Sequence, residues 1–405
     1  MLLSIIINAG FLGFFKYYNF FAVSFAELIS NFGLKADPWT LRVILPVGIS
    51  FYTFHGISYI IDIYNEKIKP EKNFINYSLF VSFFPLLVAG PIERATHLLP
   101  QLQKKRQFDY SKAIQGLKQI LWGFFKKIVI ADQCAIYANM IFNGSGHFSG
   151  STYVVGSIFF AVQIYGDFSG YSDIALGTAK LFGIDLLRNF AYPYFSRDIA
   201  EFWRRWHISL SSWFRDYLYI PLGGNKGALW MKIMNIFIVF LVSGFWHGAN
   251  WTFIAWGMLN AVYFLPSMLL KRNRLNLDIV AQGKILPSAK DVLNMSITFA
   301  MVCFAWIIFR SQNITEAFGY FSKILSRSLF SKPYCPGLIS LSTLITIITT
   351  LIFFIIEWFG REEQFAFASI GKNWNRLPRW STYYALVIIT LFYCNNQQPF
   401  IYFQF

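Results

Sequence analysis

The sequence predicts an all-α protein, a polytopic transmembrane helical bundle with about ten spanning segments plus re-entrant or interfacial helices. Hydrophobic residues make up 56% of the 405 residues and charged residues only 14%, whereas a soluble domain carries roughly 25% charged residues. Apolar stretches of spanning length also recur from one end of the chain to the other. Most of this apolar surface must face lipid, where helices satisfy their own backbone hydrogen bonds.

The predicted spanning segments are apolar and approach the length of one helical crossing, about 20 residues. They lie at about 1–29, 41–63, 74–90, 114–137, 151–166, 231–248, 249–270, 292–309, 338–358 and 381–393. No linker separates them into groups, so we expect a single membrane domain over residues 1–405.

The charge of the loops predicts the orientation of the chain. Its net charge is +15, and basic residues gather in the loops 101–112, 271–274 and 361–379, which we expect on the cytoplasmic side. The loop 139–151 has no Asp, Glu, Lys or Arg and is expected outside, so 231–270 forms a hairpin entered from the cytoplasm. Basic loops beside a membrane bind anionic lipid headgroups. We therefore expect a multi-pass protein of the cell inner (plasma) membrane with lipid partners and no nucleic acid.

The region 167–230 mixes charges with tryptophan and tyrosine, unlike a plain crossing or a soluble loop. Polar backbone at membrane depth is tolerated where protein covers it or where it lines a cavity. Pro193 and Pro221 supply helix breaks. We expect broken, re-entrant or interfacial helices here.

Two sets of residues within this region allow narrower predictions. Asp167 and Asp173 are expected to pair with arginines inside the bundle, since buried charges need partners. Trp203, Trp206 and Trp213 are three and seven residues apart and are expected to share a helical face, in packing or in an interfacial belt.

Two histidines are the strongest functional candidates. His247 lies within about thirty residues that contain no Asp, Glu, Lys or Arg, and His207 lies forty residues upstream. An ionisable side chain at membrane depth is costly and by default marks a functional site. The alternative is structural, because a buried histidine can also hydrogen-bond a neighbouring helix.

Neutral imidazole can accept the proton of a hydroxyl group near pH 7, which is the chemistry that acyl transfer requires. An oxyanion that develops in such a reaction needs nearby donors. By sequence proximity the candidates are Trp206, Trp246, Asn250 and Trp251.

Other chemistries find no support in the sequence. Cys134, Cys303, Cys335 and Cys394 lack metal-binding spacing, so no metal is expected. No GxSxG, HExxH or phosphate-binding glycine loop occurs, and no bound cofactor is expected. The N-terminus lacks a basic region and a cleavage site, and it predicts a retained helix.

Several strings together resemble the membrane-bound O-acyltransferase (MBOAT) family, and in particular its bacterial alginate O-acetyltransferase branch. They are PVGISFYTFHGISYIIDIY (46–64), FFPLLVAGPIERA (83–95), WGFFKKIVIAD (122–132), VQIYGDFSGYSDIALG (162–177), YPYFSRDIAEFWRRWHISLSSWFRDYLYIPLGGN (192–225) and FLVSGFWHGANWTFIAWG (240–257). The match is strongest over about 160–257. Relatives usually begin with additional apolar helices, so N-terminal helices of the family are expected to be missing from this chain.

The resemblance implies that His247 is the catalytic histidine and that His207 occupies the second signature position of the family. Arg204 and Arg205 are candidates to hold the phosphates of a donor, because guanidinium groups suit phosphate. Asp216 is a further candidate for the substrate tunnel.

The family also implies acetyl transfer from a cytoplasmic donor such as acetyl-CoA, used as a substrate. The acceptors would be hydroxyls of an extracellular polysaccharide, as in alginate biosynthesis, reached through a periplasmic or extracellular acetyltransferase partner. The alternatives within the enzyme class are D-alanyl transfer to teichoic acid and acylation of a lipid or protein. The alternative outside it is an acyl-group transporter subunit, although transporters usually show repeated halves and none is visible here.

Overall fold

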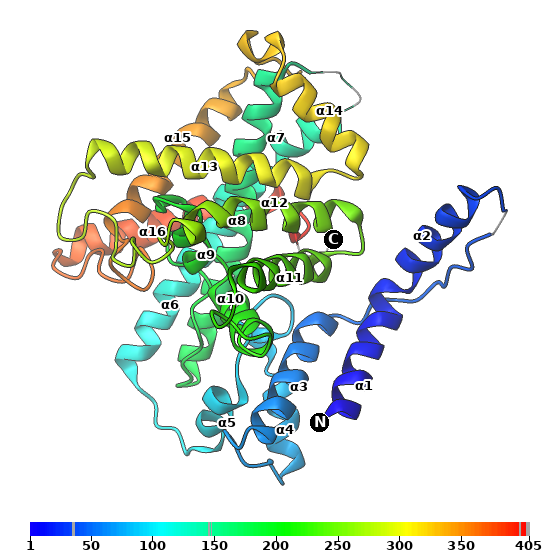
Figure 1. Ribbon diagram of the computed structural model, residues 1–405. Coiled ribbons are helices and arrows are strands. Elements are labelled where there is room, and N and C mark those ends of the chain that lie inside the picture. The colour runs from blue at the N-terminus through cyan, green and yellow to red at the C-terminus, as the bar shows by residue number, and fades with distance from the viewer. Residues whose placement is uncertain (35–36, 145, 147, 397, 402–405) are drawn as a thin grey trace.

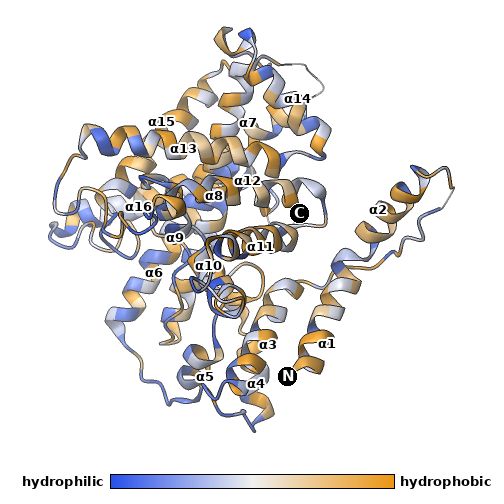
Figure 2. Ribbon diagram, in the orientation of Figure 1, coloured by the Kyte–Doolittle hydropathy of each residue, from blue (hydrophilic) through white to orange (hydrophobic). Residues whose placement is uncertain are grey.

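The computed structural model describes residues 1–34, 37–144, 146, 148–396 and 398–401, and within these ranges all regular secondary structure is helical (Figure 1). The all-α prediction is therefore confirmed. Hydrophobic residues cover most of the helices, whereas hydrophilic residues gather in the loops that connect them (Figure 2).

The α-helices are α1 (Leu2–Leu12), α2 (Tyr18–Ser30), α3 (Ile49–Tyr64), α4 (Phe74–Val81), α5 (Ala95–Gln103), α6 (Tyr110–Phe124), α7 (Asp132–Phe142), α8 (Gly150–Leu181), α9 (Ile199–Arg205), α10 (Ile208–Phe214), α11 (Leu229–His247), α12 (Trp251–Leu269), α13 (Ala289–Arg310), α14 (Ile314–Ile324), α15 (Leu341–Phe359) and α16 (Arg376–Tyr393). Three π-helical turns continue some of them directly, namely η1 (Gly13–Tyr17), η3 (Phe125–Ala131) and η5 (Arg215–Tyr219); η1 and η3 each join two α-helices, and η5 extends α10. Short 3₁₀ turns are η2 (Phe84–Leu86), η4 (Pro193–Phe195), η6 (Arg327–Phe330) and η7 (Cys394–Asn396).

Every predicted spanning segment overlaps a helix, but they differ in length and continuity. Among the described residues, four single helices are long and apolar enough to cross a membrane: α11, α12, α13 and α15. Two further runs are continuous in helical structure and contain a π-turn, from α1 through η1 to α2 and from α6 through η3 to α7. The segment 74–90 departs from the prediction, because α4 has only 8 residues and η2 begins with a proline-containing turn.

Helix α8 runs through the centre of the molecule and packs against α6, η3, α7, α13 and α14 (Figure 1). It contains Asp167 and Asp173, and it continues to Leu181, so the prediction of broken helices is wrong for residues 167–181. The charge partners are also lysines of η3 rather than arginines: Lys127 lies 2.7 Å from Asp167 and Lys126 lies 2.5 Å from Asp173. Because each carboxylate is paired, neither charge forces a break in the helix.

After α8 the chain forms short elements, as predicted, in the order η4, α9, α10 and η5. Between α9 and α10, His207 adopts the left-handed conformation with φ of 43°. The helix axis therefore breaks there, and the prediction that Trp203, Trp206 and Trp213 share one helical face is wrong. Trp206 is buried before the break, and Trp213 packs on Phe54 of α3 with ring centroids 4.3 Å apart.

Helices α11 and α12 form the predicted hairpin, with His247 at its turn. Two glycines allow their backbones to approach closely. A Cβ atom at Gly244 would overlap the carbonyl group of Phe253, and one at Gly257 would overlap that of Phe240. Small residues allow such close helix contacts in membranes, so the packing of this hairpin sets the position of His247.

Candidate active site

His247 is the last residue of α11, and its side chain lines a small, largely apolar cavity of about 20 Å³. That volume accommodates about one water molecule or a small group. The residues that line the cavity come from five parts of the chain: Ile164, Phe168, Trp206, His247, Trp306, Phe309 and Ile401. The imidazole is thus enclosed by spanning helices and by the C-terminal segment.

Aromatic rings fix the imidazole of His247 on several sides. Its ring centroid lies 4.9 Å from that of Trp246, 5.3 Å from that of Trp256 and 5.4 Å from that of Phe309. The last two contacts are close to perpendicular, at 88° and 78°. Edge-to-face contacts are favourable geometries for aromatic rings, so the side chain is held in one orientation.

His207 lies behind the cavity wall and is almost fully buried, with 1% of its surface exposed. Its ring meets Phe168 edge to face at 4.7 Å and lies 6.2 Å from Trp246, so both histidines contact the same indole. The backbone of this segment is fixed by Asn189, whose carbonyl accepts a hydrogen bond from the N–H of Ile208 at 2.9 Å. A non-glycine residue in the left-handed region stores strain, which is common at functional sites.

The C-terminal segment forms one wall of the cavity. Ile401 is 1% exposed and its backbone N–H donates to the carboxylate of Asp167 at 2.6 Å. The ammonium group of Lys127 donates to the carbonyl of Gln398 at 3.1 Å and also pairs with Asp132. This network of buried charges joins residues near the end of the chain to α8.

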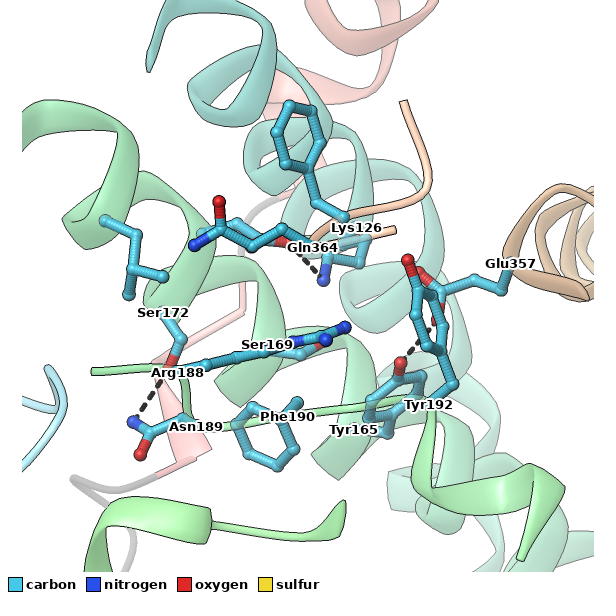
Figure 3. Close-up of a pocket in the computed structure, with 13 residues that line it drawn as sticks. Lys126, Tyr165, Ser169, Ser172, Arg188, Asn189, Phe190, Tyr192, Glu357 and Gln364 are labelled. Carbon is cyan, nitrogen blue, oxygen red and sulfur yellow. Dashed lines mark hydrogen bonds and ion pairs between the residues drawn. The ribbon is translucent and has the colours of Figure 1, made fainter. Parts of the chain in front are cut away.

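A separate polar cavity of about 20 Å³ is lined in part by Tyr165 and Phe190 (Figure 3). Both rings also contact Trp206, which lines the histidine cavity. Charged side chains of both signs line it. Lys126 pairs with Asp173, while the carboxylate of Glu357 accepts hydrogen bonds from Tyr165 at 2.5 Å and from the indole of Trp122 at 3.3 Å. The guanidinium group of Arg188 lies over the ring of Tyr192 at 5.1 Å and extends across the cavity beside Ser169 (Figure 3).

The largest apolar cavity near the site, about 480 Å³, lies between α9, α10, α11 and the end of α12. Arg204, Arg215 and Arg274 lie on its lining, which otherwise consists mostly of apolar side chains. A chain of rings connects it to the site: Trp203 lies 5.7 Å from Trp256, which contacts His247.

The loop that closes this cavity is tied by charged hydrogen bonds to α9, through Arg205 and the carbonyl of Asp278, and to the residue Arg197 just before α9. Arg197 donates to the carboxylate of Asp278 at 2.9 Å, and this bond holds the pKa of Asp278 below its usual value. Arg197 also pairs with Glu201, which accepts from Arg205 at 2.8 Å. The cavity wall is therefore cross-linked on the side that carries the basic loop 271–274.

The structure brings some of the predicted site residues together and separates others. Trp206 lines the cavity with His247, and Trp246 lies beside it. Asn250 instead caps α12, accepting from the N–H of Thr252 and donating to the carbonyl of Gln312 at 2.8 Å. Trp251 is 53% exposed and contacts Phe20.

The charged candidates lie away from the imidazole. Arg204 lines the larger cavity and donates to the carbonyls of Asn273 and Asn276 at 2.6 and 2.7 Å. Arg205 is engaged with Glu201, and Asp216 pairs with Arg215 at 2.7 Å. Arg204 is thus the member of this set that faces space large enough for a substrate.

The sequence did not predict several residues that line the cavity, namely Ile164, Phe168, Trp306, Phe309 and Ile401. Such apolar and aromatic residues are common in any membrane helix, and nothing in their local pattern distinguishes them. It also missed Lys16, the single basic residue within the first apolar segment, whose isolation was a usable signal.

Residues 65–306 match the membrane-bound O-acyltransferase family, and the chain belongs to that family. The matched range includes the predicted signature region 160–257 and both histidines. The protein is therefore an acyltransferase of the membrane.

Individual relatives agree with this assignment. The chain is 36% identical to a probable alginate O-acetylase of Pseudomonas putida, over 100% of this chain and 84% of that protein. It is 39% identical to the corresponding protein of Pseudomonas aeruginosa, over 80% of this chain and 60% of the relative. It is 37% identical to a peptidoglycan O-acetyltransferase of Helicobacter pylori, over 78% of this chain and 63% of the relative. The chain thus spans less than two thirds of the length of the last two proteins, and all three names describe enzymes rather than transporters.

Proposed function

We propose that this membrane O-acyltransferase moves acetyl groups from a cytoplasmic thioester donor, such as acetyl-CoA, to hydroxyl groups of an extracellular polysaccharide. Delivery would pass through a periplasmic acetyltransferase partner, and the protein would reside in the cell inner membrane. The observation that carries the proposal is the placement of His247 at the turn of the α11–α12 hairpin, inside an aromatic cavity between the membrane helices. The names of its relatives, alginate O-acetylase and peptidoglycan O-acetyltransferase, support a carbohydrate acceptor.

In the proposed reaction the imidazole of His247 is the general base. Neutral His247 accepts the hydroxyl proton of the acceptor while the acceptor oxygen forms its bond to the thioester carbonyl carbon. The carbonyl oxygen becomes an oxyanion, and the tetrahedral intermediate collapses when the carbon–sulfur bond breaks. The imidazolium returns its proton to the departing thiolate. An enclosed, apolar cavity excludes water that would otherwise hydrolyse the thioester.

His207 acts from behind the cavity wall. It contacts Phe168, which lines the cavity, and Trp246, which packs on His247, so it holds these rings and assists proton transfer on the donor side. Its strained backbone and the fixed loop at Asn189 support a defined position rather than general packing.

The large cavity beside α9 and α11 is the proposed donor site. Its lining combines apolar walls with the guanidinium groups of Arg204, Arg215 and Arg274, which suit an apolar arm that ends in phosphates. The cavity is closed by the basic loop 271–274, and basic loops favour the cytoplasmic side. The donor would therefore enter from the cytoplasm and extend along α11 toward His247.

D-alanyl transfer to teichoic acid is the second candidate, because the chain is also 31% identical to a teichoic acid D-alanyltransferase of Streptococcus thermophilus. That match covers 72% of this chain and 75% of the relative. Acylation of a lipid or protein would use the same imidazole chemistry, so the products distinguish these candidates.

The test measures base-labile acetate per sugar in extracellular polysaccharide from cells that carry wild type, a deletion, His247→Ala or His97→Gln, at equal membrane abundance. We expect acetate to disappear in the deletion and in His247→Ala and to persist in His97→Gln, which lies on α5 away from the cavity. Retained acetate in a stable His247→Ala protein would overturn the role of His247. Unchanged acetate in the deletion would overturn the acetyl proposal, and ester-linked D-alanine would then be measured in the same strains.

A further inference from the structure

The N-terminal helices extend from the side of the molecule, yet they contact the end of the helix that carries His247 (Figure 1). The contact is made at the π-turn η1 by Lys16 and Tyr17. The ammonium group of Lys16 donates hydrogen bonds to the carbonyls of Trp246 at 2.7 Å and His247 at 3.1 Å. The hydroxyl of Tyr17 donates to the carbonyl of Phe245 at 3.0 Å. Three consecutive carbonyls at the end of α11 are therefore bonded from one turn of another helix.

These carbonyls need an external partner. The last carbonyls of any helix lack intrahelical donors, and at membrane depth water does not replace them. Many helices solve this with a backbone N–H that turns back at the end, as in α12 and α15. At α11 the following residue, Gly248, is extended with φ of −164°, and no such bond is found among the described residues.

Lys16 is chemically suited to this position. A cation at the C-terminal end of a helix interacts favourably with the helix dipole, and its hydrogen bonds to carbonyls are charge-assisted. The ammonium group also lies 5.8 Å from the ring of Trp246 and 5.9 Å from that of Tyr17. No ion pair between Lys16 and a carboxylate is found in the described part of the chain, so the helix end is its main polar partner.

Apolar contacts strengthen the same junction. The ring of Tyr17 stacks on that of Phe245 with centroids 4.1 Å apart and an interplanar angle of 18°. Helix α1 otherwise packs mainly against α3, and its own residues are partly or fully exposed. The π-turn therefore directs both Lys16 and Tyr17 to a single place, the last turn of α11.

We propose that Lys16 is a positioning residue for His247. Its ammonium group holds the final turn of α11, and through it the imidazole, in the geometry that acyl transfer needs. This inference rests on the proposed role of His247 as the base. It gives the N-terminal helices a part in the reaction, although they do not line the cavity.

The test compares Lys16→Met, Lys16→Arg and Lys232→Met in the full chain. Methionine is similar in length but cannot donate, arginine keeps the charge and the donors, and Lys232 lies at the opposite end of α11. Polysaccharide acetate is measured at equal membrane abundance. In purified protein, amide hydrogen exchange is measured over residues 244–250.

We expect Lys16→Met to lower acetate at least about tenfold, since displacement of a catalytic group by about 1 Å can cost a hundredfold. Exchange over 244–250 should rise at least about tenfold, while Lys16→Arg restores both quantities and Lys232→Met changes neither. A loss that arginine does not rescue would overturn the proposal.

The two proposals fail in different ways. If His247→Ala abolishes acetate and Lys16→Met does not, the positioning role is overturned and the base remains. If a stable His247→Ala protein retains acetate, the proposed role of His247 as the base is overturned, and unchanged exchange in Lys16→Met would then overturn the structural role of Lys16 as well.

Discussion

The carboxylate of Asp167 accepts a hydrogen bond from the backbone N–H of Ile401 at 2.6 Å, which joins the middle of α8 to the C-terminal segment. The other oxygen of the same carboxylate pairs with Lys127 at 2.7 Å. The side chain of Ile401 then faces the cavity of His247. The buried carboxylate of Asp167 therefore both pairs with Lys127 and positions Ile401 in the lining of the cavity.

Asp167→Ala should release the C-terminal segment from α8. A hydrogen bond to a charged group contributes about 1.5–3 kcal/mol, so amide exchange at Ile401 should rise at least about tenfold. Hydrogen exchange of the C-terminal peptide in detergent-purified protein measures this effect. Asp185→Ala, which removes an exposed carboxylate paired with Lys112, is the control and should leave this exchange unchanged. Equal protection in Asp167→Ala would show that other contacts hold the segment.

Lys126→Met should destabilise the protein by about 1–3 kcal/mol, because it leaves the half-buried carboxylate of Asp173 without its charged partner and with only the hydrogen bond from Gln119. The double variant Lys126→Met with Asp173→Asn should recover part of that loss, since the unpaired charge is gone. Thermal unfolding in detergent measures the difference, with the exposed Lys290→Met as control. Additive losses in the double variant would argue against direct coupling of the pair.

Composition predicted the fold class. The apolar length of residues 231–270 and the basic residues at both ends of this segment predicted the α11–α12 hairpin. Lengths of single crossings were harder to predict. A π-turn interrupts a helix without changing its hydropathy, so sequence patterns do not reveal the turn in the run from α6 to α7. The partners of Asp167 and Asp173 were missed for the same reason, because η3 turns Lys126 and Lys127 toward α8.

Candidate site residues could be predicted where their residue type is rare in an apolar segment. His247 and His207 are ionisable groups among apolar residues, whereas the walls Phe168, Trp306 and Phe309 resemble every other aromatic in the chain. Proximity in sequence also misled, since Trp251 is four residues from His247 but faces outward after the turn.

Gly244→Ala and Gly257→Ala should each destabilise the protein by about 1–3 kcal/mol through overpacking. The added methyl group meets backbone atoms of the partner helix, which cannot rotate away. Because the hairpin turn carries His247, acetyl transfer should fall along with the unfolding temperature. Gly10→Ala in α1 is the matched control, as no atom lies within 4 Å of its added Cβ. A tolerated alanine at Gly244 would indicate that the two helices can separate without cost.

His97 should make a small, pH-dependent contribution to stability. Its hydrogen bond to the buried carboxylate of Glu93, 2.7 Å away, raises the pKa of the imidazole above its ordinary value of 6.5. A raised pKa stabilises the fold below about pH 6.5, and this stabilisation is lost as pH rises through the higher folded value. His97→Gln should therefore lower the unfolding temperature by roughly 1 °C at pH 5.5 and by less at pH 8.5, the small size reflecting the partial exposure of His97. A difference that grows toward pH 8.5 would contradict the sign of this coupling.

The π-turns also bear on how the chain tolerates changes of length. Each turn contains about one residue more than an α-helix would use, and one residue corresponds to a rotation of about 100° along the axis. Deleting a single residue within η1 or η3 would preserve an apolar helix of nearly the same length while turning one half of it relative to the other. Lys16 or the lysines of η3 would then face a different neighbour. The chain would therefore still insert into the membrane, but these lysines would no longer reach the partners that position the site.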